Sequence, residues 1–472
     1  MTERKFSSVF APGKTTRAAL GAVALALLAG CSLIPAYERP AAPVPEHFDN
    51  VTEADASPLS SWREYFSDPS LHTLIEAALN HNRDLKIALA RVEEARALAG
   101  LARADRFPTV AAQGSASRSR TPADLTGTGQ PVVASRYDVG LGVTDFELDF
   151  WGRVAALSES ARAMYLASDE ATKSFRIGLI SDVANTWLLL TELAEREQLA
   201  VEILKTREES LTIIRKRQDA GLATDLDVLA AEGLAESLRA QWVDLKRQRV
   251  QTENALRLLT GMAVMLPTPT NLANQPSMAD LAPGLPSDVL LRRPDVRAAE
   301  QRLVAANANV GAARAAFFPR IALTTGMGTA SQELSGLFDA GSKTWLFNPV
   351  LKLPLFDAGR TRANVDVAEA RKVQAVADYE KTIQQAFREV ADALAAGSTF
   401  SEQVVAEEAN QRAQQARFER VKAREQAGIA NYLEVLDASR DAFNAEQTLV
   451  SSRRQLLSAH VALYRSLGGG EE

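Results

Sequence analysis

Cys31 is the residue with the most clearly defined chemistry in this chain, and it is the only cysteine among 472 residues. It ends the lipobox-like sequence Leu28-Ala-Gly-Cys31, which follows a basic head and an 11-residue apolar core over 18–28. A core of that length is typical of an export signal and is too short for a transmembrane helix. The motif predicts cleavage after residue 30 and a covalent N-acyl and S-diacylglycerol lipid on Cys31. Because serine follows instead of aspartate, the outer membrane is the expected destination.

The other potentially reactive side chains do not cluster in the sequence. Four histidines are spread without metal-ligand spacing, and no glycine-rich phosphate loop, nucleophile elbow or HExxH pattern occurs. The formal net charge is -6 and no run of lysine or arginine is present, so nucleic acid is not an expected partner. The sequence therefore predicts a protein that is not an enzyme and that holds no metal or cofactor apart from the lipid.

A long internal repeat organises the rest of the chain. The segment Gly221-Leu-Ala-Thr-Asp-Leu-Asp-Val-Leu229 returns 207 residues later as Gly428-Ile-Ala-Asn-Tyr-Leu-Glu-Val-Leu436, and Gly152-Arg153 returns at the same offset as Gly359-Arg360. An upstream Phe-Pro pair returns at an offset of 211, so the copies differ by four residues between these two landmarks. A repeat of this size predicts a duplicated architecture.

The positions of proline predict where long helices can form. No proline occurs from 132 to 266 or from 355 to the C-terminus, and proline inside a helix costs about 3 kcal/mol. The longest predicted helices cover 154–220 and 361–427, and each would be about 100 Å long. Shorter helices are expected at 71–105, 225–259, 287–317 and 433–467. Since two short helices stacked end to end match one long helix, we expect a helical barrel in which long helices alternate with stacked pairs.

Extended stretches of about ten residues occupy the remaining windows. They are expected at 109–118, 135–147, 320–329 and 343–356, and in the second of them apolar and polar residues alternate. Strands of this length suit a tilted transmembrane β-barrel. Four strands cannot close a barrel, and lipid does not tolerate open sheet edges. Several copies of the chain must therefore combine, and three copies would supply twelve strands.

Several motifs together resemble one known family, from the lipobox to the last helix. They are Cys31-Ser-Leu-Ile-Pro-Ala-Tyr-Glu-Arg-Pro40, Trp62-Arg-Glu-Tyr-Phe-Ser-Asp-Pro69, Glu147-Leu-Asp-Phe-Trp-Gly-Arg153, Leu290-Leu-Arg-Arg-Pro-Asp295, Leu334-Ser-Gly-Leu-Phe-Asp-Ala-Gly341 and Leu467-Gly-Gly-Gly470. By these motifs the chain resembles the outer-membrane efflux lipoproteins typified by OprM, which belong to the wider TolC-like outer-membrane factors (NodT type).

The resemblance implies an α+β fold and a passive transport role. The implied assembly is a homotrimer with a 12-stranded transmembrane β-barrel, four strands per protomer, continuous with a long periplasmic α-helical barrel. It would be the exit duct of a tripartite efflux pump and would conduct antibiotics and other toxic small molecules to the exterior. The implied partners are a periplasmic adaptor (membrane fusion protein) and an inner-membrane transporter of the RND class.

The resemblance also implies a gate at the periplasmic end of the tunnel. Leu433 would form an apolar constriction, while Asp437 and Arg440 would hold neighbouring helices together by charge. Spacings of four and three residues place these side chains on one helical face. In the first copy the counterparts of the charged pair are Ala230 and Gly233, so only the second copy could supply this latch. An aspartate and an arginine so spaced are also common on an ordinary solvated helix face.

The two glycine turns resemble the tips that meet the adaptor. Their residues are Gly221, Leu222, Ala223, Thr224, Gly428, Ile429, Ala430 and Asn431. Plain helix-turn chemistry, with glycine in a left-handed conformation, would explain the same residues. Both interpretations can hold together.

The expected division of the chain follows the repeat. It comprises a signal peptide at 1–30, a lipid-anchored extended segment at 31–70, tunnel repeat 1 at 71–106 and 154–266, β-hairpin 1 at 107–153, an equatorial linker at 267–285, tunnel repeat 2 at 286–318 and 360–467, β-hairpin 2 at 319–359, and a tail at 468–472. Two alternatives stay open at this point. One is a duct of the same architecture for protein or metal export, and the other is a coiled-coil lipoprotein that braces the envelope without forming a channel.

Overall fold

The computed structural model describes residues 32–45, 48, 61–261, 266–269, 271–274 and 287–470. The expected signal peptide, Cys31 and most of the equatorial linker lie outside these residues. The chain divides into a first unit (Met1–Pro40, Glu93–Ala167 and Glu300–Asp378) and a second unit (Ala41–Val92, Ser168–Ala299 and Tyr379–Glu472). Each unit is described separately.

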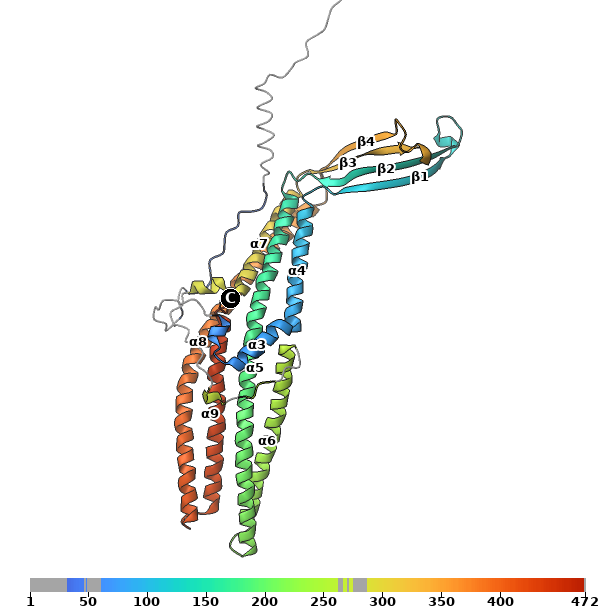
Figure 1. The fold of residues 1–472 in the computed structure, drawn as a ribbon. Coiled ribbons are helices and arrows are strands. Elements are labelled where there is room, and N and C mark those ends of the chain that lie inside the picture. The colour runs from blue at the N-terminus through green and yellow to red at the C-terminus, as the bar shows by residue number, and fades with distance from the viewer. Residues whose placement is uncertain are drawn as a thin grey trace, which may run out of the picture. The chain divides into compact units, whose positions relative to one another are not determined.

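The first unit contains one antiparallel sheet of four strands in the order β1-β2-β3-β4 (Figure 1). The strands are β1 (Val110–Thr121), β2 (Val132–Glu147), β3 (Arg320–Ser331) and β4 (Lys343–Lys352). β1 continues beyond its predicted end at 118 and reaches Thr121. β4 stops four residues earlier than expected, before Pro354.

The two faces of this sheet differ in chemistry. Ala112, Leu141, Met327 and Trp345 stand opposite one another across the four strands, and Met327 and Trp345 are 70% and 80% exposed. The next row on the same face contains Val110, Val143, Thr325 and Phe347. The opposite face carries small and polar residues such as Gln113, Gly140, Gly328 and Thr344. An exposed apolar face backed by a polar one is the pattern of a transmembrane β-barrel wall.

The strands β2 and β3 approach each other closely at two glycines. A Cβ atom on Gly140 would lie 2.6 Å from the Met327 carbonyl oxygen, and one on Gly328 would collide with the Val139 carbonyl oxygen. Only glycine fits such a backbone approach. Nearer the base of the sheet a bulge shifts the β2–β3 register between Val143 and Phe146, where Asp145 has a φ of 52°. Bulges of this kind bend a strand and increase its twist.

The helices follow the predicted pattern closely, with three exceptions. They are α2 (Trp62–Tyr65), α3 (Pro69–His81), α4 (Arg83–Ala104), α5 (Arg153–Asp219), α6 (Asp225–Thr260), α7 (Pro294–Ala315), α8 (Arg360–Gln426) and α9 (Tyr432–Ser466). Both α5 and α8 contain 67 residues. By length and composition α5 alone among the described helices could cross a membrane, but 61% of its apolar window is buried inside the protein, as in a core helix.

The single helix expected at 71–105 is in fact two helices, because Asn82 interrupts it. The Asn82 side chain accepts a hydrogen bond from the Leu85 N–H at 2.9 Å and donates one to the Leu259 carbonyl at 2.9 Å. The end of α6 therefore abuts the junction of α3 and α4. At this contact Gly261 ends α6 with a φ of 71°, and a Cβ there would collide with the His81 carbonyl. The contact of α6 with this junction is an end-to-end stack of the expected kind.

The helix expected at 287–317 is also shorter than predicted. Its first part is a 3-10 segment (Ser287–Arg292), and α7 begins only at Pro294. A residue that precedes proline is disfavoured in the α conformation, which explains the delayed start. Arg293, at this junction, donates to the Ser466 carbonyl at the end of α9 at 2.6 Å.

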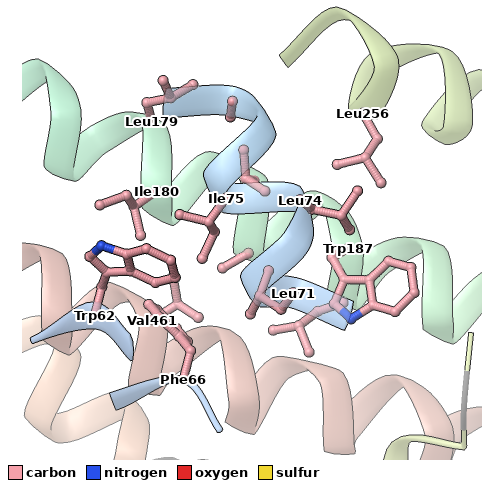
Figure 2. Close-up of a cluster of buried hydrophobic side chains, with 14 of the residues drawn as sticks. Trp62, Phe66, Leu71, Leu74, Ile75, Leu179, Ile180, Trp187, Leu256 and Val461 are labelled. Carbon is pink, nitrogen blue, oxygen red and sulfur yellow. The ribbon is translucent and has the colours of Figure 1, made fainter. Parts of the chain in front are cut away.

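The core of the second unit gathers around α3 (Figure 2). Leu74 and Ile75 of α3 are fully buried between Trp187 of α5 and side chains of α2 and α9. The Trp187 indole N–H donates to the Asp68 carboxylate at 2.8 Å, so the start of α3 is tied to α5. The short helix α2 was not predicted, and it shows that the segment expected to be extended over 31–70 is partly helical. Its Tyr65 ring stacks on Tyr464, with ring centroids 4.9 Å apart.

Candidate gate and tip sites

The two glycine turns have the same backbone geometry. Gly221 and Gly428 both have a φ of 73°. In the first turn the Leu222 N–H bonds to the Arg217 carbonyl at 2.7 Å, and in the second the Ile429 N–H bonds to the Arg424 carbonyl at 2.9 Å. This six-to-one bond, with glycine in the left-handed region, is a Schellman motif. The glycines therefore end α5 and α8 for a backbone reason.

The helices that leave the turns are capped by their own side chains. Thr224 accepts a hydrogen bond from the Asp227 N–H, and the Asp227 carboxylate accepts one from the Thr224 N–H at 2.8 Å. Asn431 caps α9 by accepting from the Glu434 N–H at 3.0 Å. Such caps stabilise a helix start by about 1 kcal/mol each. The acidic residues near the first turn thus have a local role, and the hydrogen bonds from Thr224 lower the pKa of Asp227.

Two large apolar side chains at the turns are left exposed. Leu222 is 78% exposed and its counterpart Ile429 is 69% exposed. Helix-turn chemistry alone explains the glycines and the caps but does not require leucine or isoleucine at the exposed position. Because the same position is apolar in both copies of the repeat, each turn offers one exposed apolar side chain that a binding partner could contact.

The structure places the three predicted gate residues on one stretch of α9. Leu433 is 52% exposed, and Arg440 lies 3.3 Å from Asp437 one turn away. Within the protomer this ion pair is therefore internal to α9. Both side chains are about half exposed, so the pair adds at most about 1 kcal/mol to helix stability. The charges remain available to a neighbouring helix at small cost.

A second acidic residue belongs to the same group and was missed by the sequence analysis. Asp441 lies 3.3 Å from Arg440 and 2.8 Å from Arg417 of α8. It therefore links α9 to its antiparallel partner, and Arg440 is shared between two carboxylates. The available signal was the Arg440-Asp441 neighbour pair, but the distance to Arg417 depends on how the two helices pack.

Near the turns, charged and aromatic side chains also connect helices that belong to the two copies of the internal repeat. Arg217 of α5 lies 2.9 Å from Glu425 of α8. Burial raises the pKa of Tyr432, while a hydrogen bond with Ser210 of α5 acts in the opposite direction. Burial, and then the positive charge of Arg440, lowers the pKa of Arg207, whose guanidinium lies 5.9 Å from the centroid of the Phe443 ring. Two arginines thus repel each other beside the gate residues.

This arrangement suits a movable contact better than a reaction site. The ion pairs are partly exposed, Arg440 and Asp441 each have two partners, and exposed pairs are individually weak. Among the described residues no group of three or more histidine, cysteine, aspartate or glutamate side chains could hold a metal ion. The side chains near the turns can therefore hold helices together and release them without a large energetic barrier.

Known proteins are similar to this chain along nearly its whole length. The profile of the family described as "Outer membrane efflux protein" matches residues 74–262 and 285–469, one segment in each copy of the repeat. The solvent efflux pump outer membrane protein SrpC of Pseudomonas putida is 44% identical over 456 residues, which cover 95% of this chain and 97% of the relative. Outer membrane protein OprJ of Pseudomonas aeruginosa is 44% identical over 457 residues, covering 96% and 95%.

Solved structures show the same fold. A membrane protein from Pseudomonas aeruginosa has a TM-score of 0.88 and 44% identity, and the match covers 93% of this chain and all of the other. The open state of the Neisseria gonorrhoeae MtrE outer membrane channel has a TM-score of 0.84 and 38% identity, covering 93% and 98%.

Proposed function

This chain belongs to the outer membrane efflux protein family, and from that premise we propose that it is the exit duct of a tripartite efflux pump. It is an outer-membrane efflux channel, built as a homotrimer with a transmembrane β-barrel and a periplasmic α-helical tunnel. The observation that carries the proposal is the four-stranded sheet with an exposed apolar face and two free edges. Free edges are not tolerated in lipid, so the sheet must close with sheets from other copies.

The partners of the duct follow from its passive role. A channel in the outer membrane has no energy source of its own, so active efflux requires a transporter in the inner membrane. We infer a transporter of the RND class and a periplasmic adaptor that contacts the turns at 221–224 and 428–431. Relatives are named for solvents and for antibiotics, as in SrpC and the antibiotic efflux pump protein ArpC. The proposed cargo is therefore a range of toxic small molecules.

Deletion of the gene from a Gram-negative host that carries the cognate pump tests this function. We expect increased susceptibility to solvents and to several unrelated antibiotics, because the pump would have no exit through the outer membrane. Restoring the full-length chain should restore resistance. Unchanged susceptibility in the deletion strain, with the pump demonstrably expressed, would contradict the proposal.

The lipid on Cys31 is part of the same proposal. The lipobox supports an anchor in the periplasmic leaflet of the outer membrane, and a triply acylated residue holds a protein stably on a membrane surface. The described strap that follows it, residues 32–40, lies along α7. Asn307 of α7 donates to the Pro35 carbonyl at 2.8 Å, and Glu300 binds Arg39 at 2.7 Å.

The gate is proposed to lie at Leu433, Asp437 and Arg440. Three-fold symmetry would turn each of these residues into a ring of three, and a ring of aspartates is unfavourable unless cations pair with it. Arg440 supplies those cations, and Asp441 holds Arg440 in place from the same helix. We infer an iris-like opening at the periplasmic tip, in which these pairs separate when the adaptor engages the turns.

The exposed apolar residues at the turns give a prediction about the adaptor. Replacing both Leu222 and Ile429 with aspartate should weaken adaptor binding at least about tenfold. Two apolar side chains that become buried in the complex would contribute on the order of 3 kcal/mol to its binding free energy. The affinity can be measured with purified trimer and purified adaptor. Because the side chains are exposed, trimer stability should not change.

The conservative variant with Leu222→Ile and Ile429→Val serves as the control and should bind the adaptor normally. Equal affinity of the aspartate variant and the control would show that the turns serve only to reverse the chain.

A further inference from the structure

A large pocket in the described part of the first unit lies at the base of the sheet. Its volume is about 1300 Å³, and its walls come from α4, from the start of α5, from the end of β2 and from the strap. A volume of this size exceeds the range of about 300–1000 Å³ that is common for small-ligand sites. It can therefore hold a headgroup together with part of an acyl chain.

Arginine dominates the polar lining of this pocket. Arg96, Arg103, Arg106 and Arg162 all line it. Arg96 lies 3.6 Å from Glu93 on its own helix. In the part of the chain that the structure describes, the guanidinium groups of the other three make no ion pair or hydrogen bond. Three unpaired guanidinium groups around one pocket favour an anionic occupant, because each presents a fork of N–H donors that matches phosphate.

Most of the acidic lining is already engaged elsewhere. Glu147 binds Arg153 at 2.7 Å and Arg320 at 2.8 Å. Asp149 accepts the Ala155 N–H at 2.7 Å, so it occupies the N-terminus of α5. Glu159 is the one acidic lining residue without a described side-chain partner, and three unpaired arginines line the same pocket. The net charge of the unengaged groups is therefore positive.

The strap fixes where this pocket lies relative to the membrane. Ser32 and Ile34 line it, and Ser32 directly follows the proposed acylated residue. Ile34 packs against α7 at Gly311 so closely that a Cβ there would lie 2.6 Å from its side chain. Acyl chains one residue away must enter the lipid, so the mouth of the pocket is within reach of the inner leaflet of the outer membrane.

We propose that this pocket binds the phosphate of an anionic membrane phospholipid, with Arg103, Arg106 and Arg162 as its ligands. Phe146 of β2 and Tyr165 of α5 supply apolar wall beside the arginines, where the upper part of an acyl chain can lie. The bound lipid would lie beside the covalent lipid and occupy the pocket at the base of the sheet. This inference rests on the proposed anchor at Cys31 and goes beyond it, because it assigns a second, non-covalent lipid.

Native mass spectrometry of the full-length detergent-solubilised trimer tests the proposal. The probes are phosphatidylglycerol, diacylglycerol with the same acyl chains, and inorganic phosphate. We expect phosphatidylglycerol to be retained and diacylglycerol to be lost. The double variant R103Q/R162Q should retain phosphatidylglycerol at least about tenfold less, since it loses two charge-assisted contacts.

The matched control is R91Q/R371Q, which removes two exposed arginines that do not line the pocket. It should retain the lipid as the unmodified trimer does. Equal retention by R103Q/R162Q and the control would overturn the assignment. Binding of inorganic phosphate with no preference for the lipid would overturn it as well, because the acyl chains would then contribute nothing.

The same sample separates this proposal from the anchor. Under denaturing conditions only covalent lipid stays on the chain, so the mass of the unfolded protein reports acylation of Cys31 independently. Loss of the covalent mass with retained phosphatidylglycerol would refute the anchor and support the pocket. The reverse result would refute the pocket alone.

Discussion

Replacing Gly328 with alanine is expected to abolish most assembly of the folded trimer. The new Cβ would collide with the Val139 carbonyl oxygen and lie 2.6 Å from the Gly140 Cα, and backbone atoms of a paired strand cannot move aside cheaply. Overpacking costs about 1–3 kcal/mol at a single site. Because the trimer contains the clash three times, the strain should be sufficient to prevent closure of the barrel.

The yield of trimer in the outer-membrane fraction measures this effect, and we expect a drop of more than about tenfold for Gly328→Ala. Gly114→Ala is the matched control, since its Cβ would meet its nearest atom, in Val139, at 3.9 Å, an ordinary contact. The control should assemble normally. Similar yields for both variants would show that β2 and β3 do not approach as closely as described.

Replacing Arg293 with methionine is expected to destabilise the second unit by about 1–3 kcal/mol. The Arg293 side chain is buried and binds Asp295 at 2.7 Å, Glu389 at 2.7 Å and the Ser466 carbonyl at 2.6 Å. Methionine fills a similar volume but leaves all three acceptors without this donor. The contact between the end of α9 and the start of α7 should therefore loosen.

Thermal unfolding of the purified trimer, followed by the helical circular dichroism signal, measures this effect as a lower midpoint. Arg388→Met is the control, because Arg388 is 71% exposed and lies 3.9 Å from Asp392. It should leave the midpoint nearly unchanged. If both variants unfold at the same temperature, the Arg293 contacts do not stabilise the unit.

Local signals in the sequence were sufficient to predict the long helices and their turns. The helix expected at 154–220 is α5 (Arg153–Asp219), and the one expected at 361–427 is α8 (Arg360–Gln426). Proline-free windows and left-handed glycines act within a few residues, so a single sequence reveals them. The fold class, the outer-membrane location and the efflux role, which the motifs implied, are confirmed by the family match.

Features that depend on packing were not predicted. The break at Asn82 needs the Leu259 carbonyl from a helix 177 residues away, and the bulge at Asp145 needs a hydrogen bond from its N–H to the Thr324 hydroxyl of β3. Asp441 joins the gate residues only because α8 brings Arg417 beside it. The roles proposed for Leu433, Asp437 and Arg440 depend further on the neighbouring protomers, which a single chain does not contain.

Single-channel conductance of the purified trimer in a planar bilayer tests the central claim most directly. We predict a small conductance for the unmodified channel and a severalfold larger one for D437A/R440A, because the ion pairs proposed to hold the tip closed would be removed. The double variant D392A/R388A, which removes an exposed pair on α8 instead of α9, should conduct like the unmodified channel. A bilayer in which neither the unmodified trimer nor D437A/R440A forms a pore would contradict the assignment as an exit duct.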